Sequence, residues 1–279
     1  MHSVTIGNVE IRALQDARPL MDPRYMFPPY ADQMLDEYPD LIVDQERQLM
    51  QLQITSFLVR TAGKNVLIDS GLGNRKRSGF PPGNLDEALR EAGVDRGEID
   101  YVVHTHLHVD HVGWNTVDNE QGEPEIYFPK ARFVIQEPEW DYWMEPEKVE
   151  APGNEHLKQC VEPLRHSGRI DFFNGEAPFD ENLTFIGTPG HTPGHVSIGV
   201  YSAGERAVIV GDASHHPMQL DHPDWSPAFD IEPERAAATR SRLFEEAASD
   251  GQTWIAGHWP YPGIGRIVPL NGKRVFQGL

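Results

Sequence analysis

Hydrophobic positions along the chain follow two patterns, short apolar runs and longer stretches with apolar residues at helical spacing. Short runs rich in β-branched residues predict buried strands. They cover residues 4–6, 9–14, 52–60, 66–68, 99–103, 131–136, 183–186, 196–201, 207–210 and 253–256, the last of which is expected to be the final buried strand. Helical spacing predicts helices over 85–92, 138–144, 155–166 and 234–248. Alternating strands and helices indicate a layered α/β protein.

Residues 16–51 interrupt this pattern, because proline and aromatic residues are frequent there and no regular period is visible. A long irregular segment inside a compact chain is usually a functional loop or a disordered one. The aromatic and methionine content of 25–30 argues against disorder. We therefore expect either a lid or substrate wall, or a loop that packs on the core or on a second subunit.

Composition and charge exclude several classes of protein. At 279 residues the chain can bury one sizeable core, and we expect a single domain over 1–279. No run approaches the roughly 18 apolar residues of a membrane helix, and residues 1–10 lack the regions of a signal peptide, so a cytoplasmic location is expected. With 43 acidic against 24 basic residues the net charge is −19, which makes nucleic acid and membrane surfaces poor partners.

The candidate chemistry is concentrated in residues 104–113. Three imidazoles and a carboxylate fall within six residues, at His106, His108, Asp110 and His111. A predicted strand precedes them and Gly113-Trp114 resembles the entry to a helix, so they are expected on a strand-to-helix loop. Imidazole and carboxylate without thiolate suits zinc or another first-row divalent metal with an open position for water. A histidine-rich surface loop is the weaker interpretation at this density of ligands.

Polar groups also follow several other predicted strands. His191 and His195 lie in a rigid turn of glycine and proline at 187–195. Asp212 follows a buried strand and His258 follows the final predicted one. Asp69 could orient a ligand histidine or merely cap its turn.

Other reactive residues are read more conservatively. The basic run Arg75-Lys76-Arg77 is expected to be a solvated loop, or less favourably a contact for an anionic substrate group. His156 and His166 are isolated and are expected at the surface. The one cysteine, Cys160, excludes an internal disulfide and any multi-cysteine zinc site, and a structural role is expected for it.

Taken together, these motifs resemble the metallo-β-lactamase superfamily in their order and approximate spacing. The resemblance implies an αββα sandwich with two central mixed sheets, flanking helices and a dinuclear site at the sandwich edge. It implies that a first metal is held by His106, His108 and His191, a second by Asp110, His111 and His258, with Asp212 bridging the two. His195 matches a position that is not a ligand.

Within the superfamily, the chain is similar to the branch of lactonases and methyl parathion hydrolase. The matching phrases are residues 110–115, 211–216 and 258–265. True β-lactamases of this fold lack the bridging aspartate seen here at Asp212, and the oxygen-reducing di-iron branch carries a glutamate where this chain has His108. Many lactonases place a tyrosine three residues after the bridging aspartate, where this chain has His215.

The resemblance implies a dinuclear metal-dependent hydrolase that opens lactones or carboxylic esters with a metal-bridging hydroxide. Asp110 and His215 are the expected catalytic residues, the first handling protons and the second shaping substrate contacts. The expected cofactors are two divalent ions, Zn²⁺ first, with Mn, Fe or Co as alternatives. Phosphotriester hydrolysis is the leading alternative, followed by thioester hydrolysis and a non-enzymatic binding module. The expected partners are a small-molecule substrate and a second copy of the chain in a homodimer.

Overall fold

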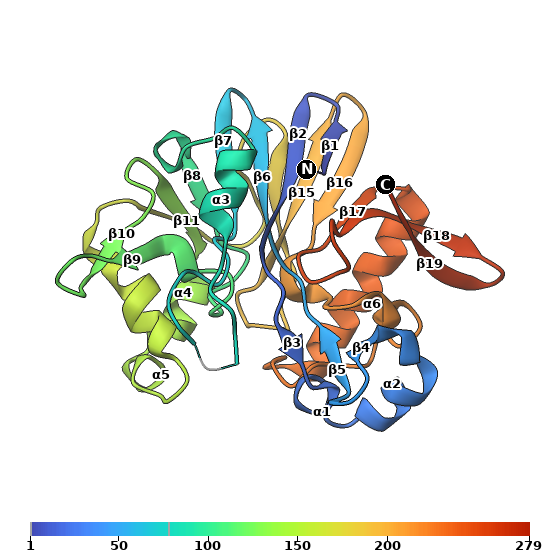
Figure 1. The fold of residues 1–279 in the computed structure, drawn as a ribbon. Coiled ribbons are helices and arrows are strands. Elements are labelled where there is room, and N and C mark those ends of the chain that lie inside the picture. Colours follow the sequence, from blue (N-terminus) through green and yellow to red (C-terminus); the bar gives the residue numbers. More distant parts are fainter. Residues whose placement is uncertain (1, 78) are drawn as a thin grey trace.

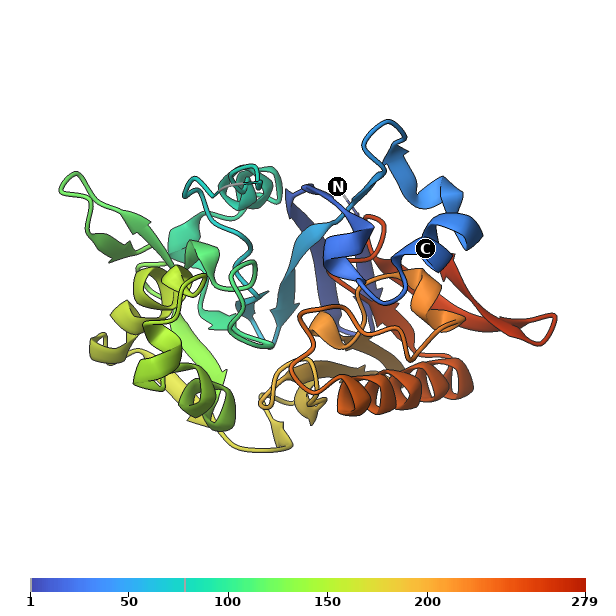
Figure 2. The ribbon, with the colours of Figure 1, turned by 90° about the horizontal axis from the view of Figure 1, so that it is seen from below.

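The computed structural model describes residues 2–77 and 79–279. Two seven-stranded sheets face each other, and helices cover their outer faces (Figure 1). Helices α3 and α4 lie outside the first sheet, and α6 lies outside the second (Figure 1). Seen from below, α6 and the α4–α5 region lie on opposite sides of the molecule (Figure 2). The predicted αββα sandwich is therefore correct.

The first sheet is antiparallel at one edge and parallel at the other. Strands β1, β2, β6 and β7 pair antiparallel, whereas β7, β8, β11 and β12 pair parallel. In sheet order the bounds are Ser3–Ile6 (β1), Val9–Ala17 (β2), Ile54–Thr61 (β6), Lys64–Ile68 (β7), Tyr101–Val103 (β8), Arg132–Gln136 (β11) and Ile170–Phe173 (β12).

The second sheet is antiparallel except where β16 pairs parallel with β17. In sheet order the bounds are Ala177–Pro178 (β13), Leu183–Gly187 (β14), Val196–Ser202 (β15), Glu205–Ile209 (β16), Thr253–Ile255 (β17), Ile264–Leu270 (β18) and Lys273–Gly278 (β19). The expectation that 253–256 is the final strand is wrong, because β18 and β19 follow. Their polar residues and Pro269 conceal them, and only Ile264, Gly265 and Ile267 of the two strands are buried.

Side chains that alternate along each strand supply two layers of core. Phe57 and Val59 of β6 join residues of the second sheet in the central cluster, whereas Leu58 packs outward with Leu85 and Leu89 of α3. Each such Val, Leu or Phe side chain contributes about 1.5–3 kcal/mol when fully buried. Period-two alternation therefore fixes which face of each strand meets the other sheet.

The helices are short except for α6. Their bounds are Pro23–Met26 (α1), Ala31–Glu37 (α2), Leu85–Glu91 (α3), Glu137–Trp143 (α4), Pro146–Val149 (α5) and Pro233–Asp250 (α6). Helix α6 begins with Pro233 in its first turn and ends at Gly251, whose φ of 62° is left-handed. Its buried residues recur at helical spacing and pack on the second sheet.

Residues 16–51 are more regular than the sequence suggested. After β2 they form α1, α2, a 3₁₀ turn at Pro39–Leu41 and a small sheet of Leu20–Met21 (β3), Leu49–Gln51 (β5) and Ile42–Asp44 (β4). These elements are too short to show a period, which is why the segment reads as irregular. Met26 and Met34 are fully buried in one cluster with Met218 and Trp225. We call residues 18–52 the cap.

Two segments that were predicted to be α-helical, the one after Gly113 and residues 155–166, form short 3₁₀ or π turns instead. Gly113–Asn115 is a single 3₁₀ turn, and a short hairpin of Thr116–Asp118 (β9) and Pro124–Ile126 (β10) follows it. A Cβ atom at Gly113 would lie 2.0 Å from the carbonyl carbon of Leu72, so the backbone is pinned there. Residues 155–166 form a π turn at Leu157–Val161 and a 3₁₀ turn at Glu162–His166, since Pro163 cannot donate a helical hydrogen bond.

Within the described residues, no helix is both long enough and apolar enough to cross a bilayer.

Candidate metal centre

Loops at one edge of the sandwich deliver the seven predicted ligands. The loop 104–113 follows β8, and the turn 188–195 follows β14. Asp212 lies in the 3₁₀ turn Gly211–Ala213 after β16, and His258 follows β17. Gly211 has a φ of 56° and would place a Cβ atom 2.6 Å from His195, so glycine is required at this turn.

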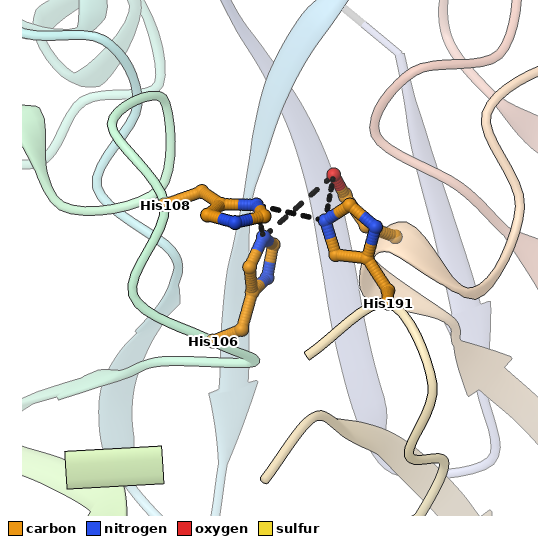
Figure 3. A group of neighbouring side chains, drawn as sticks. His106, His108 and His191 are labelled. Atoms are coloured by element: carbon orange, nitrogen blue, oxygen red, sulfur yellow. Dashed lines mark hydrogen bonds and ion pairs between the residues drawn. The ribbon is translucent and has the colours of Figure 1, made fainter. Parts of the chain in front are cut away.

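The first group of donors comprises His106, His108, His191 and Asp212. The labelled histidines point toward one another (Figure 3). His108 Nδ1 lies 2.8 Å from His191 Nε2 and 3.1 Å from His106 Nε2. Asp212 Oδ2 lies 3.3 Å from His191 Nε2 and 3.7 Å from His106 Nε2. Ligands about 2.0–2.1 Å from a tetrahedral ion lie roughly 3.3 Å apart, so this set matches a single zinc-sized ion.

The second group comprises Asp110, His111 and His258. His258 Nε2 lies 3.6 Å from Asp110 Oδ2, and His111 Nε2 lies 3.8 Å from Asp110 Oδ1. Asp212 also reaches this group, with Oδ1 3.2 Å from His111 Nε2 and Oδ2 3.1 Å from His258 Nε2. The Asp212 carboxylate therefore stands between the two groups.

The second ring nitrogen of four of these histidines is already engaged. His191 Nδ1 donates to Asp230 Oδ1 and His111 Nδ1 donates to Asp69 Oδ2, both at 2.8 Å. His258 Nδ1 donates to the Gln53 carbonyl at 2.5 Å, and His106 Nδ1 lies 3.0 Å from Thr105 Oγ1. These contacts fix the tautomers so that each Nε2 lone pair faces the site.

The buried charges at the site also fit divalent cations. His111 Nε2 and Asp212 Oδ1 are buried without a hydrogen-bond partner among the described residues. Burial, followed by neighbouring histidines, holds the pKa of His106 and His108 well below its usual value, so both imidazoles are neutral. Burial lowers the pKa of His111, but the carboxylates of Asp212, Asp69 and Asp110 outweigh this effect and raise the pKa well above its usual value. These carboxylates attract a cation, and neutral imidazole is the form that binds a metal.

Asp69 and His195 support the site from outside. Asp69 accepts from His111, as proposed for an orienting carboxylate, and also from the Thr105 N–H at 2.8 Å. His195 belongs to neither donor group, and its Nε2 accepts the Asp212 backbone N–H at 2.9 Å. Burial lowers the pKa of His195 to about 3, which keeps Nε2 free to accept.

Two supporting groups were not anticipated from the sequence. Asp230 orients His191, and its Oδ2 accepts a hydrogen bond at 2.9 Å from Nη2 of Arg240, a fully buried residue of α6. Glu139 of α4 accepts from Leu107 in the 104–113 loop and from Thr192 in the 188–195 turn. No local pattern marks these residues, because the partners Arg240, Leu107 and Thr192 lie at least ten positions away from them in the chain.

His215 lies beside the metal groups. Its Nε2 is 3.2 Å from Asp212 Oδ2, and its ring stacks on His258 with centroids 5.3 Å apart and an interplanar angle of 8°. Burial lowers the pKa of His215. Its catalytic role stays a prediction.

A cavity of about 780 Å³ opens onto the centre. Met21, Tyr25 and Met26 of the cap contribute an apolar wall, and Asp110, Asp212 and His215 lie at the metal end. The sequence predicted that residues 16–51 form either a lid or substrate wall, or a loop packed on the core or on a second subunit. The lining of the cavity agrees with a substrate wall. The same cap also packs on the core.

Three conservative expectations need correction. Arg75 is not solvated, because its side chain is 9% exposed and binds Asp118. His156 is 3% exposed and its Nε2 donates to the Leu107 carbonyl at 3.2 Å, whereas His166 is exposed as expected. Arg77 is partly buried and lines the cavity. The sequence hides these contacts because they all join segments distant in the chain.

Cys160 is fully buried, with Sγ 3.7 Å from the Gly113 carbonyl. Burial raises the pKa of this thiol, which keeps it protonated. These contacts agree with the structural role expected of Cys160.

The profile of the metallo-beta-lactamase superfamily matches residues 49–258, and the chain belongs to this superfamily. The N-acyl homoserine lactonase AttM of Rhizobium radiobacter is 29% identical over 185 residues, which cover 62% of this chain and 63% of the relative. The N-acyl homoserine lactonase AiiA of Bacillus thuringiensis subsp. kurstaki is 23% identical over 229 residues, covering 76% and 83%.

Solved structures agree with this assignment. AbOPH, a hydrolase of the beta-lactamase superfamily, is 28% identical with a TM-score of 0.85, covering 100% of this chain and 97% of that one. AidC, a dizinc quorum-quenching lactonase, is 24% identical with a TM-score of 0.82 and the same coverage. The protein is therefore a metal-dependent hydrolase with a dinuclear site for divalent ions.

Proposed function

We propose that the protein hydrolyses lactones or carboxylic esters at two zinc ions. The observation that carries this proposal is the pair of donor groups joined by Asp212 at the end of a cavity with an apolar wall. Such a wall suits an acyl chain, and the relatives AttM and AiiA are N-acyl homoserine lactonases. Zinc suits donors that are imidazole and carboxylate only, although Mn, Fe or Co would accept the same set.

We assign the first ion to His106, His108 and His191, the second to Asp110, His111 and His258, and the bridge to Asp212. When bound, two such ions lower the pKa of a water toward about 7 and polarise a substrate carbonyl.

Asp110 is the proposed proton carrier of the reaction. It lines the cavity with its side chain 16% exposed, so one carboxylate faces both a metal ligand and the substrate space. We assign to it the orientation of the attacking water and the transfer of a proton to the leaving oxygen.

His215 is proposed to contact the substrate carbonyl, in the place where many lactonases have a tyrosine. It lines the cavity and lies 3.2 Å from Asp212. We expect His215→Ala to lower kcat/KM by about 10- to 100-fold with two metals retained per chain, since a hydrogen bond to developing charge is worth about 1.5–3 kcal/mol. Steady-state kinetics and metal analysis test this, and unchanged kcat and KM would contradict the role.

The decisive experiment is ring opening of a long-chain acyl-homoserine lactone by the zinc-loaded protein, followed with a pH indicator. We expect turnover in the wild type and a loss of about 10²- to 10⁴-fold in Asp110→Asn, because general acid–base catalysis contributes about that much. Zinc content of both proteins is the control. A wild type that carries two metals and opens no lactone would refute the lactonase proposal, and aryl esters and phosphotriesters would be assayed next.

A further inference from the structure

Residues 214–230, which we call the support segment, hold two groups of the metal centre. Asp230 Oδ1 accepts a hydrogen bond from His191 Nδ1 at 2.8 Å, and Gln219 Oε1 accepts the His215 N–H at 2.8 Å. Asp230 and Gln219 are both buried. The position of the support segment therefore determines how the His191 imidazole and the His215 backbone are oriented.

The support segment also binds the cap. Trp225 is 3% exposed, and its ring stacks on Tyr30 of the cap with centroids 5.3 Å apart and an interplanar angle of 10°. The Ala228 N–H donates to the carbonyl of Met26, a residue of the apolar cavity wall, at 2.8 Å. One segment thus contacts both the substrate wall and the partners of the metal centre.

The backbone carbonyl of Trp225 connects these two sets of contacts. It accepts from Gln219 Nε2 at 2.7 Å and from Arg240 Nη1 at 3.4 Å. Arg240 Nη2 binds Asp230 Oδ2 at 2.9 Å, and Arg240 Nε donates to the Ala213 carbonyl at 2.9 Å. Because Gln219 and Arg240 are fully buried, water cannot replace a partner that moves away from them. A displaced Trp225 would therefore disturb the side chains that hold His215 and Asp230.

Trp225 is not among the described residues that line the cavity, so its ring does not contact a substrate there. We propose that Trp225 is a positioning residue that couples the cap to the first metal group. The cap is then better ordered when zinc is bound, and zinc affinity is higher when the cap is held in place, since coupling between two sites is reciprocal. This coupling goes beyond the proposed hydrolysis and does not depend on which substrate rests on the apolar wall.

Hydrogen exchange tests the coupling from the metal side. Helix α2 of the cap contributes no described residue to the donor groups or to the cavity lining, so no contact with a metal ligand protects its amides directly. We expect zinc to slow exchange of these amides in the wild type by about 2- to 10-fold, which corresponds to the free energy of one aromatic pair. The slowing should be absent in Trp225→Leu and restored in Trp225→Phe, which keeps a ring to stack on Tyr30.

Zinc affinity, measured by competition with a chromophoric chelator, tests the coupling from the cap side. We expect Trp225→Leu to weaken binding of one of the two ions by about 10-fold, since losing an outer partner of a metal-bound histidine costs about 10- to 100-fold. Tyr30→Leu leaves Trp225 intact and should weaken binding of the same ion by about 2- to 10-fold. Phe128→Leu is the matched control, because it removes a fully buried ring from the core of the first sheet and should lower Tm without changing zinc affinity.

Wild-type zinc affinity in both Trp225→Leu and Tyr30→Leu would overturn this inference, as would α2 exchange in the wild type that is the same with and without zinc. An equal loss of zinc affinity in Phe128→Leu would also overturn it, because the effect would then be general destabilisation. If Trp225→Leu does not fold, Tyr30→Leu and the wild-type exchange decide the result. Neither measurement uses turnover, so failure of the coupling is distinguished from failure of the proposed hydrolysis.

Discussion

At the scale of single residues, Glu139 joins the two loops that carry the first metal group. Its Oε1 accepts from the Leu107 N–H at 3.0 Å and from Trp143 Nε1 at 2.8 Å. Its Oε2 accepts from Thr192 Oγ1 at 2.7 Å and from the Gly194 N–H at 3.1 Å. Burial raises the pKa of this carboxyl although the four donors lower it. His106, His108 and His191 thus depend for their relative placement on one buried carboxylate.

We expect Glu139→Gln to lower the free energy of unfolding by about 2–4 kcal/mol and to weaken zinc binding. A glutamine amide offers one oxygen, so its NH₂ group faces two of the four donors and leaves them unpaired, which costs about 1–3 kcal/mol for each buried group. Urea unfolding and zinc titration measure the two effects. Glu137→Gln, on the exposed face of the same helix, is the control. Wild-type zinc affinity in Glu139→Gln would show that the two loops hold their positions without it.

The sequence predicted the donors of the site better than their supports. The seven residues that converge are close in sequence or follow strands, so local patterns and the resemblance identify them. The supporting roles of Glu139 and Asp230 were not predicted, because acidic residues are common at the start of a helix and in loops. The role of Arg240 was not predicted, because an arginine on a helix usually faces solvent, whereas Arg240 is fully buried. Their roles arise from the packing of elements that are distant in the chain.

At the scale of elements, Asp16 joins three segments of the first half of the molecule. It lies at the end of β2, and its Oδ2 accepts the Leu72 N–H at 2.6 Å. Its Oδ1 accepts the Leu85 N–H at the start of α3 at 2.8 Å and Trp114 Nε1 at 2.9 Å. Burial raises the pKa of Asp16 to about 6, against the lowering effect of these donors.

This shift makes part of the stability dependent on pH. Because the folded state holds the proton more tightly than the unfolded chain, the contribution of Asp16 is fully present below about pH 4 and is lost as the pH rises through about 6. We expect the free energy of unfolding of the wild type, relative to Asp16→Asn, to fall by about 2.4 kcal/mol between pH 4 and 7. Urea unfolding at each pH measures this difference, in which metal loss common to both proteins cancels.

Asp32→Asn, at an exposed position of α2, controls for the removal of one carboxyl group. A difference between wild type and Asp16→Asn that stays constant over this range would mean that Asp16 keeps an ordinary pKa.

Long or strongly patterned elements were predictable, whereas short ones were not. The strands β6 and β15 and the helix α6 have enough residues to show their period. The cap elements have two to seven residues each, so their order comes from the cluster around Met26 and Trp225 and not from local preference. The same limit explains why residues 113–115 became one turn of a helix and no more.

At the scale of the whole molecule, the metal centre joins the two halves of the sandwich. Four donors come from the 104–113 loop beside the first sheet, and His191, Asp212 and His258 come from the second. The centre also gathers carboxylates in a chain that already has a net charge of −19. The single domain, cytoplasmic location, homodimer and lack of affinity for nucleic acid stay predictions.

Because the donors come from both halves, removing the ions should loosen the packing between the sheets. At a free metal concentration about 1,000 times Kd, each ion stabilises the folded state by about 4 kcal/mol. For a chain of this size, we expect chelation to lower Tm by about 10 °C or more, given a shift of roughly 2–4 °C for each kcal/mol. Calorimetry before and after dialysis against a chelator, with metal analysis of both samples, measures the shift, and added zinc should restore it. His106→Ala should have a lower Tm than the wild type before chelation, and chelation should lower its Tm by less. An unchanged Tm in metal-free wild type would mean that the sheets hold together without the ions.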